Sequence, residues 1–183
     1  FALAAQDTVS NLFGFAVIFA DRPFMLGDIV KIGDIMGTVE ELGARSVRIR
    51  TFDKTLVVMP NSQVASSTIE NISARTVRRV STTLGLTYET SADEMEKIIE
   101  DIRKVVTEHE KLVGEDSVVA FEAFGDSSLN IRIVFFVKEL GYADYLRVVQ
   151  EINLALMRAV AARDLSVALP TRTLYLRQDV SGE

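Results

Sequence analysis

The chain of 183 residues is long enough for one large domain or two small ones, each with a core of its own. Its residues are 48% hydrophobic and 25% charged, which excludes both a disordered tail and an ordinary multi-span membrane protein. The absence of cysteine excludes disulfides and thiolate metal sites, and it fits a reducing compartment.

The net charge of -6 is unevenly distributed. Residues 1–81 carry 9 Lys and Arg against 8 Asp and Glu, whereas residues 82–183 carry 11 against 18. The acidic second half is therefore a poor nucleic-acid surface. The sequence starts at Phe1 without a methionine or a basic, signal-like stretch, so we expect it to begin inside a longer polypeptide.

The first predicted element is a helix over residues 8–20, which contain no charged side chain. At the helical rise this segment reaches about 20 Å, short of the roughly 30 Å hydrocarbon core, so it cannot span a bilayer alone. Two interpretations stay open: a buried core helix, or the end of a membrane or interfacial helix. Pro23 predicts that the helix ends at Asp21 and Arg22.

Short strands with tight turns follow, and they predict a small closed or half-closed five-stranded barrel. The expected strands are residues 28–32, 35–42, 45–52, 55–59 and 68–73. Strands 45–52 and 68–73 are the expected edges that pair between subunits. The turn at Asp53 and Lys54 lacks the glycine that a tight hairpin favours, so its type is expected to differ.

The remainder alternates strand, helix, strand, strand, helix, strand, which is the split unit of ferredoxin-like folds. Ser91 and Glu94 form a capping box at the start of the first of these helices. The strands are expected at residues 80–88, 117–123, 128–138 and 172–177, and the second helix at 144–163. The fold class is therefore α+β, with both helices on one face of an antiparallel sheet.

Several local motifs, in this order and spacing, resemble the small-conductance mechanosensitive (MscS-like) ion channels over nearly the whole chain. The motifs are residues 4–13, Asp21-Arg22-Pro23-Phe24, Gly27-Asp28, Ile32-Gly33-Asp34, Gly37-Thr38-Val39, Arg48-Ile49-Arg50-Thr51, Pro60-Asn61-Ser62 and 124–130.

The resemblance implies a homoheptamer whose last transmembrane helix lines a central pore. Below the pore it implies an Sm-like β-domain and a ferredoxin-like α/β-domain that enclose a cytoplasmic vestibule with side openings. On this pattern residues 1–22 end the pore helix, 23–78 form the β-domain, 79–177 the α/β-domain and 178–183 a tail.

The implied function is that of a pore-forming subunit of a tension-gated, weakly selective channel that relieves hypo-osmotic pressure. The implied partners are further copies of the chain, membrane lipids, and permeating ions and small solutes, with no cofactor and no nucleic acid. The implied location is the inner (plasma) membrane, with most of this chain on the cytoplasmic side.

On the same pattern Leu3 falls at the lower pore constriction, where a leucine ring cannot replace an ion's hydration; plain helix packing is the alternative. Gln6 and Asp7 are expected to line the pore below it. Asp7 stands where the family has a glycine that lets the helix bend. Its carboxylate either forms a cation-favouring ring or is a solvated or N-capping residue at a helix break, and the second interpretation is favoured. Gly14 is the alternative hinge.

The resemblance also predicts that Asn11 contacts the Pro60-Asn61-Ser62 turn, so that Asn11, Asn61 and Ser62 couple pore and vestibule. Arg22 is expected to bind lipid phosphate, or else to pair with Asp21 or another subunit. The cluster of Arg75, Arg78 and Arg79 either rims a vestibule opening, meets anionic lipid, or is a solvated linker.

No catalytic or metal site is expected. Gly125-Asp126-Ser127-Ser128 lacks the final glycine of a nucleophile elbow, and His109, the only histidine, falls at a helix end where a structural role is favoured. Two rival functions make different demands on the sequence. A soluble Sm-like RNA-binding ring needs a basic, aromatic-rich face, and a ligand-binding regulatory domain of a transporter needs a discrete pocket.

Overall fold

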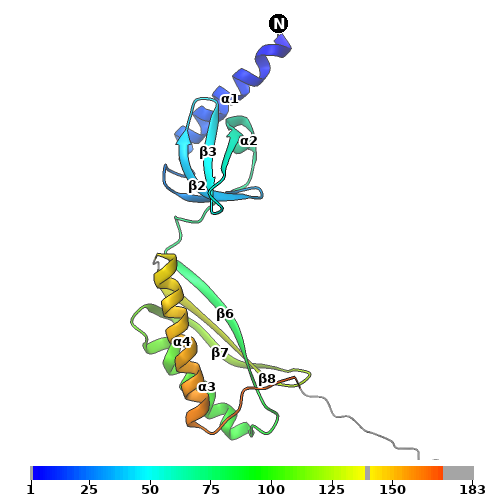
Figure 1. The fold of residues 1–183 in the computed structure, drawn as a ribbon, viewed down its shortest axis with the longest axis vertical. Coiled ribbons are helices and arrows are strands. Elements are labelled where there is room, and N and C mark those ends of the chain that lie inside the picture. Colours follow the sequence, from blue (N-terminus) through cyan, green and yellow to red (C-terminus); the bar gives the residue numbers. More distant parts are fainter. Residues whose placement is uncertain (1, 139–140, 171–183) are drawn as a thin grey trace, which may run out of the picture. The chain divides into compact units, whose positions relative to one another are not determined.

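The structure is a computed structural model that describes residues 2–138 and 141–170 (Figure 1). The chain divides into two compact units, one up to Arg75 and one from Thr76 onward. Each unit has its own hydrophobic core. The mixed α+β class expected from the sequence is confirmed.

The first unit combines one long helix with a five-stranded antiparallel sheet in the order β4-β3-β2-β1-β5. Its elements are α1 (Ala2–Asp21), β1 (Ile29–Ile32), β2 (Ile35–Leu42), β3 (Ser46–Thr51), β4 (Leu56–Pro60), α2 (Asn61–Ser66) and β5 (Ile69–Asn71). All five expected strands are present, and α1 ends at Asp21 as Pro23 predicts.

Two expectations for this unit are wrong. The segment Pro60-Asn61-Ser62 is not only a turn, because Asn61 begins the helix α2. Strand 45–52 is not an edge either, because β3 lies between β2 and β4, and the edges of the sheet are β4 and β5. Alternation within a strand reveals which side chains are buried, but not which strands are its neighbours.

The turn between β3 and β4 contains no glycine, and a lysine takes the conformation that glycine favours. Thr51 N donates to Thr55 O at 2.9 Å, so the loop holds three residues, and the third, Lys54, has a φ of 67°. A three-residue hairpin loop characteristically ends with a residue in this left-handed region. The lysine therefore adopts the conformation that a glycine would adopt most easily.

The core of the first unit lies between α1, α2 and the sheet. Ile18 brings α1 into it, Val64 brings α2, and Phe24 follows the end of α1. The sheet contributes Val30, Ile32, Val39, Val47, Ile49 and Met59. Within the described residues, no helix is both long and apolar enough to cross a membrane.

The second unit packs two helices on a three-stranded antiparallel sheet in the order β6-β8-β7. Its elements are β6 (Val77–Leu86), α3 (Ala92–Glu108), β7 (Leu112–Phe124), β8 (Leu129–Lys138) and α4 (Tyr142–Ala162). Ser91 is the N-cap of α3, and its side chain accepts a hydrogen bond from Glu94 N at 3.2 Å, as the capping box predicts. β7 begins earlier than expected and contains two register shifts.

The central strand β8 shows that both helices cover the same face of this sheet. Its alternate residues Leu129, Ile131, Ile133, Phe135 and Val137 all join one core with buried residues of α3 and α4. Residues that alternate on a strand share a face, so the expected one-sided packing is confirmed. The strand expected at 172–177 lies outside the described residues, although Val167 already bridges to Leu86 of β6.

Candidate functional site

The contact between α1 and α2 is held by one buried polar side chain. Asn11 of α1 retains only 7% exposure, and its Oδ1 accepts hydrogen bonds from Ser62 N at 3.0 Å and from Ser62 Oγ at 2.9 Å. Its Nδ2 donates to the backbone O of Asp7, one helical turn earlier, at 2.8 Å. Both ends of the amide are therefore satisfied, as a buried amide requires.

One helical turn further, Gly14 brings the two backbones into close contact. A Cβ atom added at Gly14 would lie 2.7 Å from the carbonyl C and O of Asn61 and 2.9 Å from the N of Ser62. Ile18, the next residue on this face, is buried in the core. Asn11, Gly14 and Ile18 thus form the face of α1 that packs against the rest of the first unit. We call this face the docking face, and the rest of the first unit, with α2 and the five strands, the sheet unit.

Asn61 fixes the other side of this contact. It is fully buried, its backbone N donates to Arg45 O at 2.9 Å, and its Nδ2 donates to Gly43 O at 2.9 Å. These bonds attach the start of α2 to the turn between β2 and β3. Among the residues that the structure describes, Asn61 Oδ1 has no hydrogen-bond partner.

The predicted coupling residues are therefore brought together. The expected contact of Asn11 with Ser62 is present, whereas the side chain of Asn61 bonds to Gly43. Sequence reasoning gave Gly14 a hinge role and missed its packing against α2. The one available signal was a glycine three residues after Asn11 in an otherwise uninterrupted apolar helix.

The helix break expected at Asp7 is absent, because α1 runs continuously through Asp7 and Gly14. Asp7 is therefore not an N-cap here, and it lies in the interior of a helix that starts before it. Gln6 and Asp7 are both exposed on α1. Leu3 lies in the same helix, but its side chain falls outside what the structure describes.

The remainder of α1 presents an apolar surface. Several large side chains remain exposed there: Val9 (63%), Leu12 (53%), Phe13 (72%) and Phe19 (58%). At 3.6 residues per turn, these positions fall on the broad side of α1 opposite the docking face. A cavity of about 430 Å³ between α1 and the β2–β3 turn is lined by Asp7, Thr8, Asn11, Leu12, Ala44 and Arg45.

The predicted cluster of arginines does not form a single patch. The guanidinium of Arg78 lies 5.0 Å from the ring centre of Tyr145 and 6.0 Å from that of Tyr142, on the helix-covered side of β6. The exposed Arg79 follows it directly on the strand and so points to the opposite face. Arg22 has a φ of 46°, and its guanidinium lies 5.7 Å from the ring centre of Phe19.

In the second unit an ion-paired cluster joins the two helices. Arg163, after the end of α4, contacts Asp101 Oδ2 at 2.6 Å and Glu94 Oε2 at 3.5 Å, both on α3. The hydrogen bond from Arg163 lowers the pKa of Asp101. The pKa of Glu94 is also lowered, first by its hydrogen bond with Lys97 and then by Arg163.

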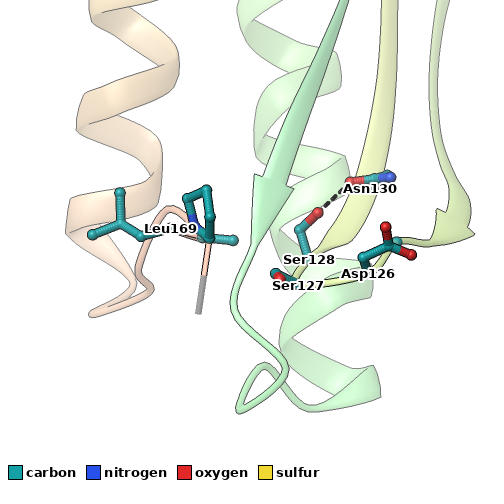
Figure 2. A pocket seen from close by; sticks show the side chains of 8 residues that line it. Asp126, Ser127, Ser128, Asn130 and Leu169 are labelled. Atoms are coloured by element: carbon teal, nitrogen blue, oxygen red, sulfur yellow. Dashed lines mark hydrogen bonds between the residues drawn. The ribbon is translucent and has the colours of Figure 1, made fainter. Parts of the chain in front are cut away.

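The loop after β7 lines a cavity of about 610 Å³, but its side chains do not form a catalytic set. Figure 2 shows Ser128 Oγ donating to Asn130 Oδ1 at 2.7 Å, with Leu169 across from the loop. The lining residues are Gly125, Asp126, Ser127, Ser128, Asn130, Ala168, Leu169 and Pro170, which include no general base other than Asp126.

His109 is the C-cap of α3, with its Nε2 3.3 Å from Glu151 Oε2. Within the described ranges no group of three or more side chains is arranged to hold a metal ion.

Comparison with known proteins gives a consistent match to both units. A family described as the mechanosensitive ion channel β-domain matches residues 7–74. A second, described as the C-terminal part of the mechanosensitive ion channel MscS, matches residues 80–167. The two matches adjoin the division between the compact units.

Individual relatives agree with these matches. The small-conductance mechanosensitive channel MscMJ of Methanocaldococcus jannaschii is 43% identical over 97% of this chain and 51% of the relative. The low conductance mechanosensitive channel YnaI of Escherichia coli is 36% identical over 95% of this chain and 51% of the relative. The chain thus spans about half the length of these curated relatives.

Solved structures show the same fold. The closed-state crystal structure of Helicobacter pylori MscS superimposes with a TM-score of 0.77 at 26% identity, covering 97% of this chain and 69% of that one. Arabidopsis thaliana MSL1 (A320V) gives a TM-score of 0.85 at 22% identity, covering 93% of this chain and 64% of that one. At 22% identity, the similarity to MSL1 shows a common fold only.

Proposed function

The chain belongs to the small-conductance mechanosensitive (MscS) channel family, and from this premise we propose that it is part of a pore-forming subunit of a tension-gated, weakly selective channel. The family is one of ion channels rather than enzymes. Opening of such a channel releases small solutes and ions and so relieves hypo-osmotic pressure. Membrane tension favours whichever of two states has the larger in-plane area.

The observation that carries this proposal is the docking face of α1. A helix with an exposed apolar surface is held to the sheet unit by two hydrogen bonds from Ser62 to Asn11 and by the close contact at Gly14. A displacement of α1 therefore acts directly on α2 and, through Asn61, on the β2–β3 turn. This arrangement supports Asn11, Asn61 and Ser62 as the coupling between pore and vestibule.

The remaining family assignments are part of the same proposal. Leu3 forms the hydrophobic constriction of a sevenfold ring, with Gln6 and Asp7 lining the pore below it, and Gly14 or Asp7 lies at the bend of the pore helix in other states. The subunits assemble through the sheet edges β4 and β5, which are different strands and therefore suit a head-to-tail ring. The ring lies in the inner membrane, where it meets lipids and passes ions and small solutes.

The rival RNA-binding ring is disfavoured by the charges of β3. Arg48 pairs with Glu41 at 2.9 Å and Arg50 pairs with Glu40 at 2.8 Å, so both cations are occupied by carboxylates of the neighbouring strand. An RNA surface needs basic side chains that are available to phosphates. A regulatory ligand-binding role lacks support from the cavity in Figure 2, which is lined by small polar residues and an exposed leucine.

The test is current recording from the full-length protein reconstituted in liposomes. We expect conductance steps that open with applied tension and discriminate weakly between cations and anions. Replacing Leu3→Ser lowers the tension needed for opening, because a hydroxyl wets the constriction. The matched control is Leu146→Ser, which changes an exposed leucine of α4 and leaves the threshold unchanged. Absence of tension-dependent current in the unsubstituted protein contradicts the proposal.

A further inference from the structure

A short turn after α1 exposes two large apolar side chains in a fixed conformation. Met25 is 60% exposed and Leu26 is 64% exposed, although Phe24 immediately before them is buried in the core. We call residues 23–28 the apolar turn. Single exposed apolar residues are common on protein surfaces, so their exposure alone carries no meaning. The conformation of the turn and its surroundings provide the argument.

The apolar turn is bracketed by hydrogen bonds on both sides. Asp28 Oδ2 accepts from Met25 N at 2.9 Å and from Asn71 Nδ2 at 2.9 Å. Asn71 Nδ2 also donates to Pro23 O at 3.1 Å, and Gly27 N donates to Val39 O at 2.8 Å. Gly27 has a φ of 89°, a conformation that glycine adopts without strain.

These four hydrogen bonds fix the conformation of the apolar turn. Here the backbone is tied to β2 and β5 while Met25 and Leu26 are directed outward. The exposure of Met25 and Leu26 is therefore a fixed feature of the fold.

The neighbouring residues match a lipid surface. Arg22, three residues before Met25, is exposed and lies 5.7 Å from the ring of Phe19, which is itself 58% exposed at the end of α1. An exposed cation thus lies in the sequence between the apolar end of α1 and the apolar turn. Apolar side chains next to an arginine suit the boundary between acyl chains and phosphate headgroups.

We infer that the apolar turn inserts Met25 and Leu26 into the headgroup–acyl boundary of the membrane, with Arg22 binding lipid phosphate beside it. This inference rests on the proposed function, since it needs α1 to lie at a membrane. It adds a second contact with lipid, carried by the sheet unit rather than by the helix. Lipid packing then acts on β1 and β5 directly through Asp28 and Asn71.

The experiment measures how deeply the turn sits in the membrane of the full-length channel in vesicles. This chain has no cysteine, so a nitroxide label is introduced through Leu26→Cys, with any cysteine elsewhere in the protein first replaced by serine. The matched control is Phe52→Cys, an apolar side chain of the β3–β4 loop with 59% exposure. Collision rates are then measured with oxygen, which concentrates in lipid, and with a water-soluble nickel chelate.

We expect the ratio of oxygen to nickel collisions to be several-fold higher at Leu26 than at Phe52. Equal ratios overturn the inference, because the turn then lies in water. Low collision rates with both reagents also overturn it, because another copy of the chain or an upstream segment then covers the turn. Adding phosphatidylglycerol to phosphatidylcholine vesicles is expected to raise the ratio further, and Arg22→Gln is expected to abolish that increase.

The outcome is separable from that of the proposed function. If the ratio is high but the vesicles show no tension-dependent current, the membrane contact stands and the channel proposal fails. If current is present but the ratio at Leu26 equals that at Phe52, the channel proposal stands and this inference fails. As a further check, Asn71→Ala breaks the bracket and is expected to increase the mobility of the label.

Discussion

The side-chain oxygen of Asn11 accepts two hydrogen bonds from Ser62, which lies 51 residues further along the chain. One bond comes from the backbone N at 3.0 Å and the other from the hydroxyl at 2.9 Å. A single side chain thus satisfies one of the free N–H groups at the start of α2 while it holds α1 in place.

Replacing Asn11→Ala is expected to destabilise the docked helix by about 1–3 kcal/mol, because the Ser62 N–H is left buried without a partner. Thermal unfolding of the detergent-solubilised protein measures the loss. Ser10→Ala, at an exposed position of the same helix, is the control and does not lower the midpoint, because alanine is the better helix former. If both variants unfold at the same temperature, the hydrogen bonds do not hold α1.

Replacing Gly14→Ala tests the close contact of the docking face. Alanine is favoured over glycine in a helix by about 1 kcal/mol, whereas overpacking typically costs about 1–3 kcal/mol. Since the added Cβ meets backbone atoms of Asn61 at 2.7 Å, which cannot move as a side chain does, we expect a net loss of stability.

The comparison for Gly14→Ala is Ala16→Gly, at an exposed position of α1 where the helix-propensity effect acts alone. Both variants are expected to lower the unfolding midpoint, for opposite reasons. A midpoint for Gly14→Ala above that of the unsubstituted protein means that helix propensity outweighs packing at this contact.

Much of the fold follows from periodicity in the sequence. The five strands of the first unit are visible as short runs between turn residues, and in β3 and β8 the buried positions also recur at every second residue. The short helix α2 escaped because it spans only residues 61–66 and buries a single apolar side chain, Val64, which leaves no helical period to detect. The order of the strands could not be predicted, because alternation within a strand carries no information about which strands lie beside it.

The residues of the candidate site were predicted only in part, because periodicity does not show which segments come into contact. The contact of Asn11 with Ser62 came from the family resemblance, not from any local pattern. The packing role of Gly14 depends on how closely α2 approaches, and that distance is set by the bonds of Asn61 to the β2–β3 turn. A glycine in a sequence shows freedom of the backbone, whereas its use in close packing appears only in three dimensions.

The ion-paired cluster of the second unit predicts a dependence on pH. Because the pKa of Asp101 is lower in the folded state, its pairing with Arg163 stabilises the fold above the unfolded pKa of an aspartate and is lost as the pH falls through the folded pKa. Asp101→Asn is therefore expected to lower stability at neutral pH and to flatten the acid limb of the stability profile. Unfolding midpoints from neutral to acidic pH measure both effects.

Glu100→Gln is the matched control for this prediction, since Glu100 is the exposed neighbour of Asp101 on α3. It is expected to leave the acid limb close to that of the unsubstituted protein. If Asp101→Asn retains the full acid sensitivity, the cluster does not contribute to it.

The free edge β4 yields a prediction about assembly. Thr51 bonds to Thr55 and Asn61 bonds to Arg45 across the β3–β4 pair, so by alternation the N–H of Val58 points away from β3. Val58→Pro therefore removes no bond to β3, but it blocks pairing with another copy. We expect a folded subunit with reduced assembly, measured as particle mass in detergent.

Ile49→Pro is the contrasting variant. Ile49 is fully buried in the interior strand β3, so proline there removes a ladder bond and disrupts folding itself. Proline at the exposed Glu110 is expected to have a smaller effect than either. A full ring mass for Val58→Pro shows that β4 is not a subunit seam.

The two separate cores have a consequence for how the protein is made. The buried residues of the first core lie between Ile18 and Val64, and those of the second lie between Leu86 and Val160. A nascent chain therefore releases every member of the first core from the ribosome before any member of the second. Because domains generally fold as units with the N-terminal one first, the first unit can be complete while translation of the second unit continues. A substitution that damages the second core then leaves a finished first unit attached to an unfolded second unit, and unfolded chains are what chaperones and proteases act on in cells.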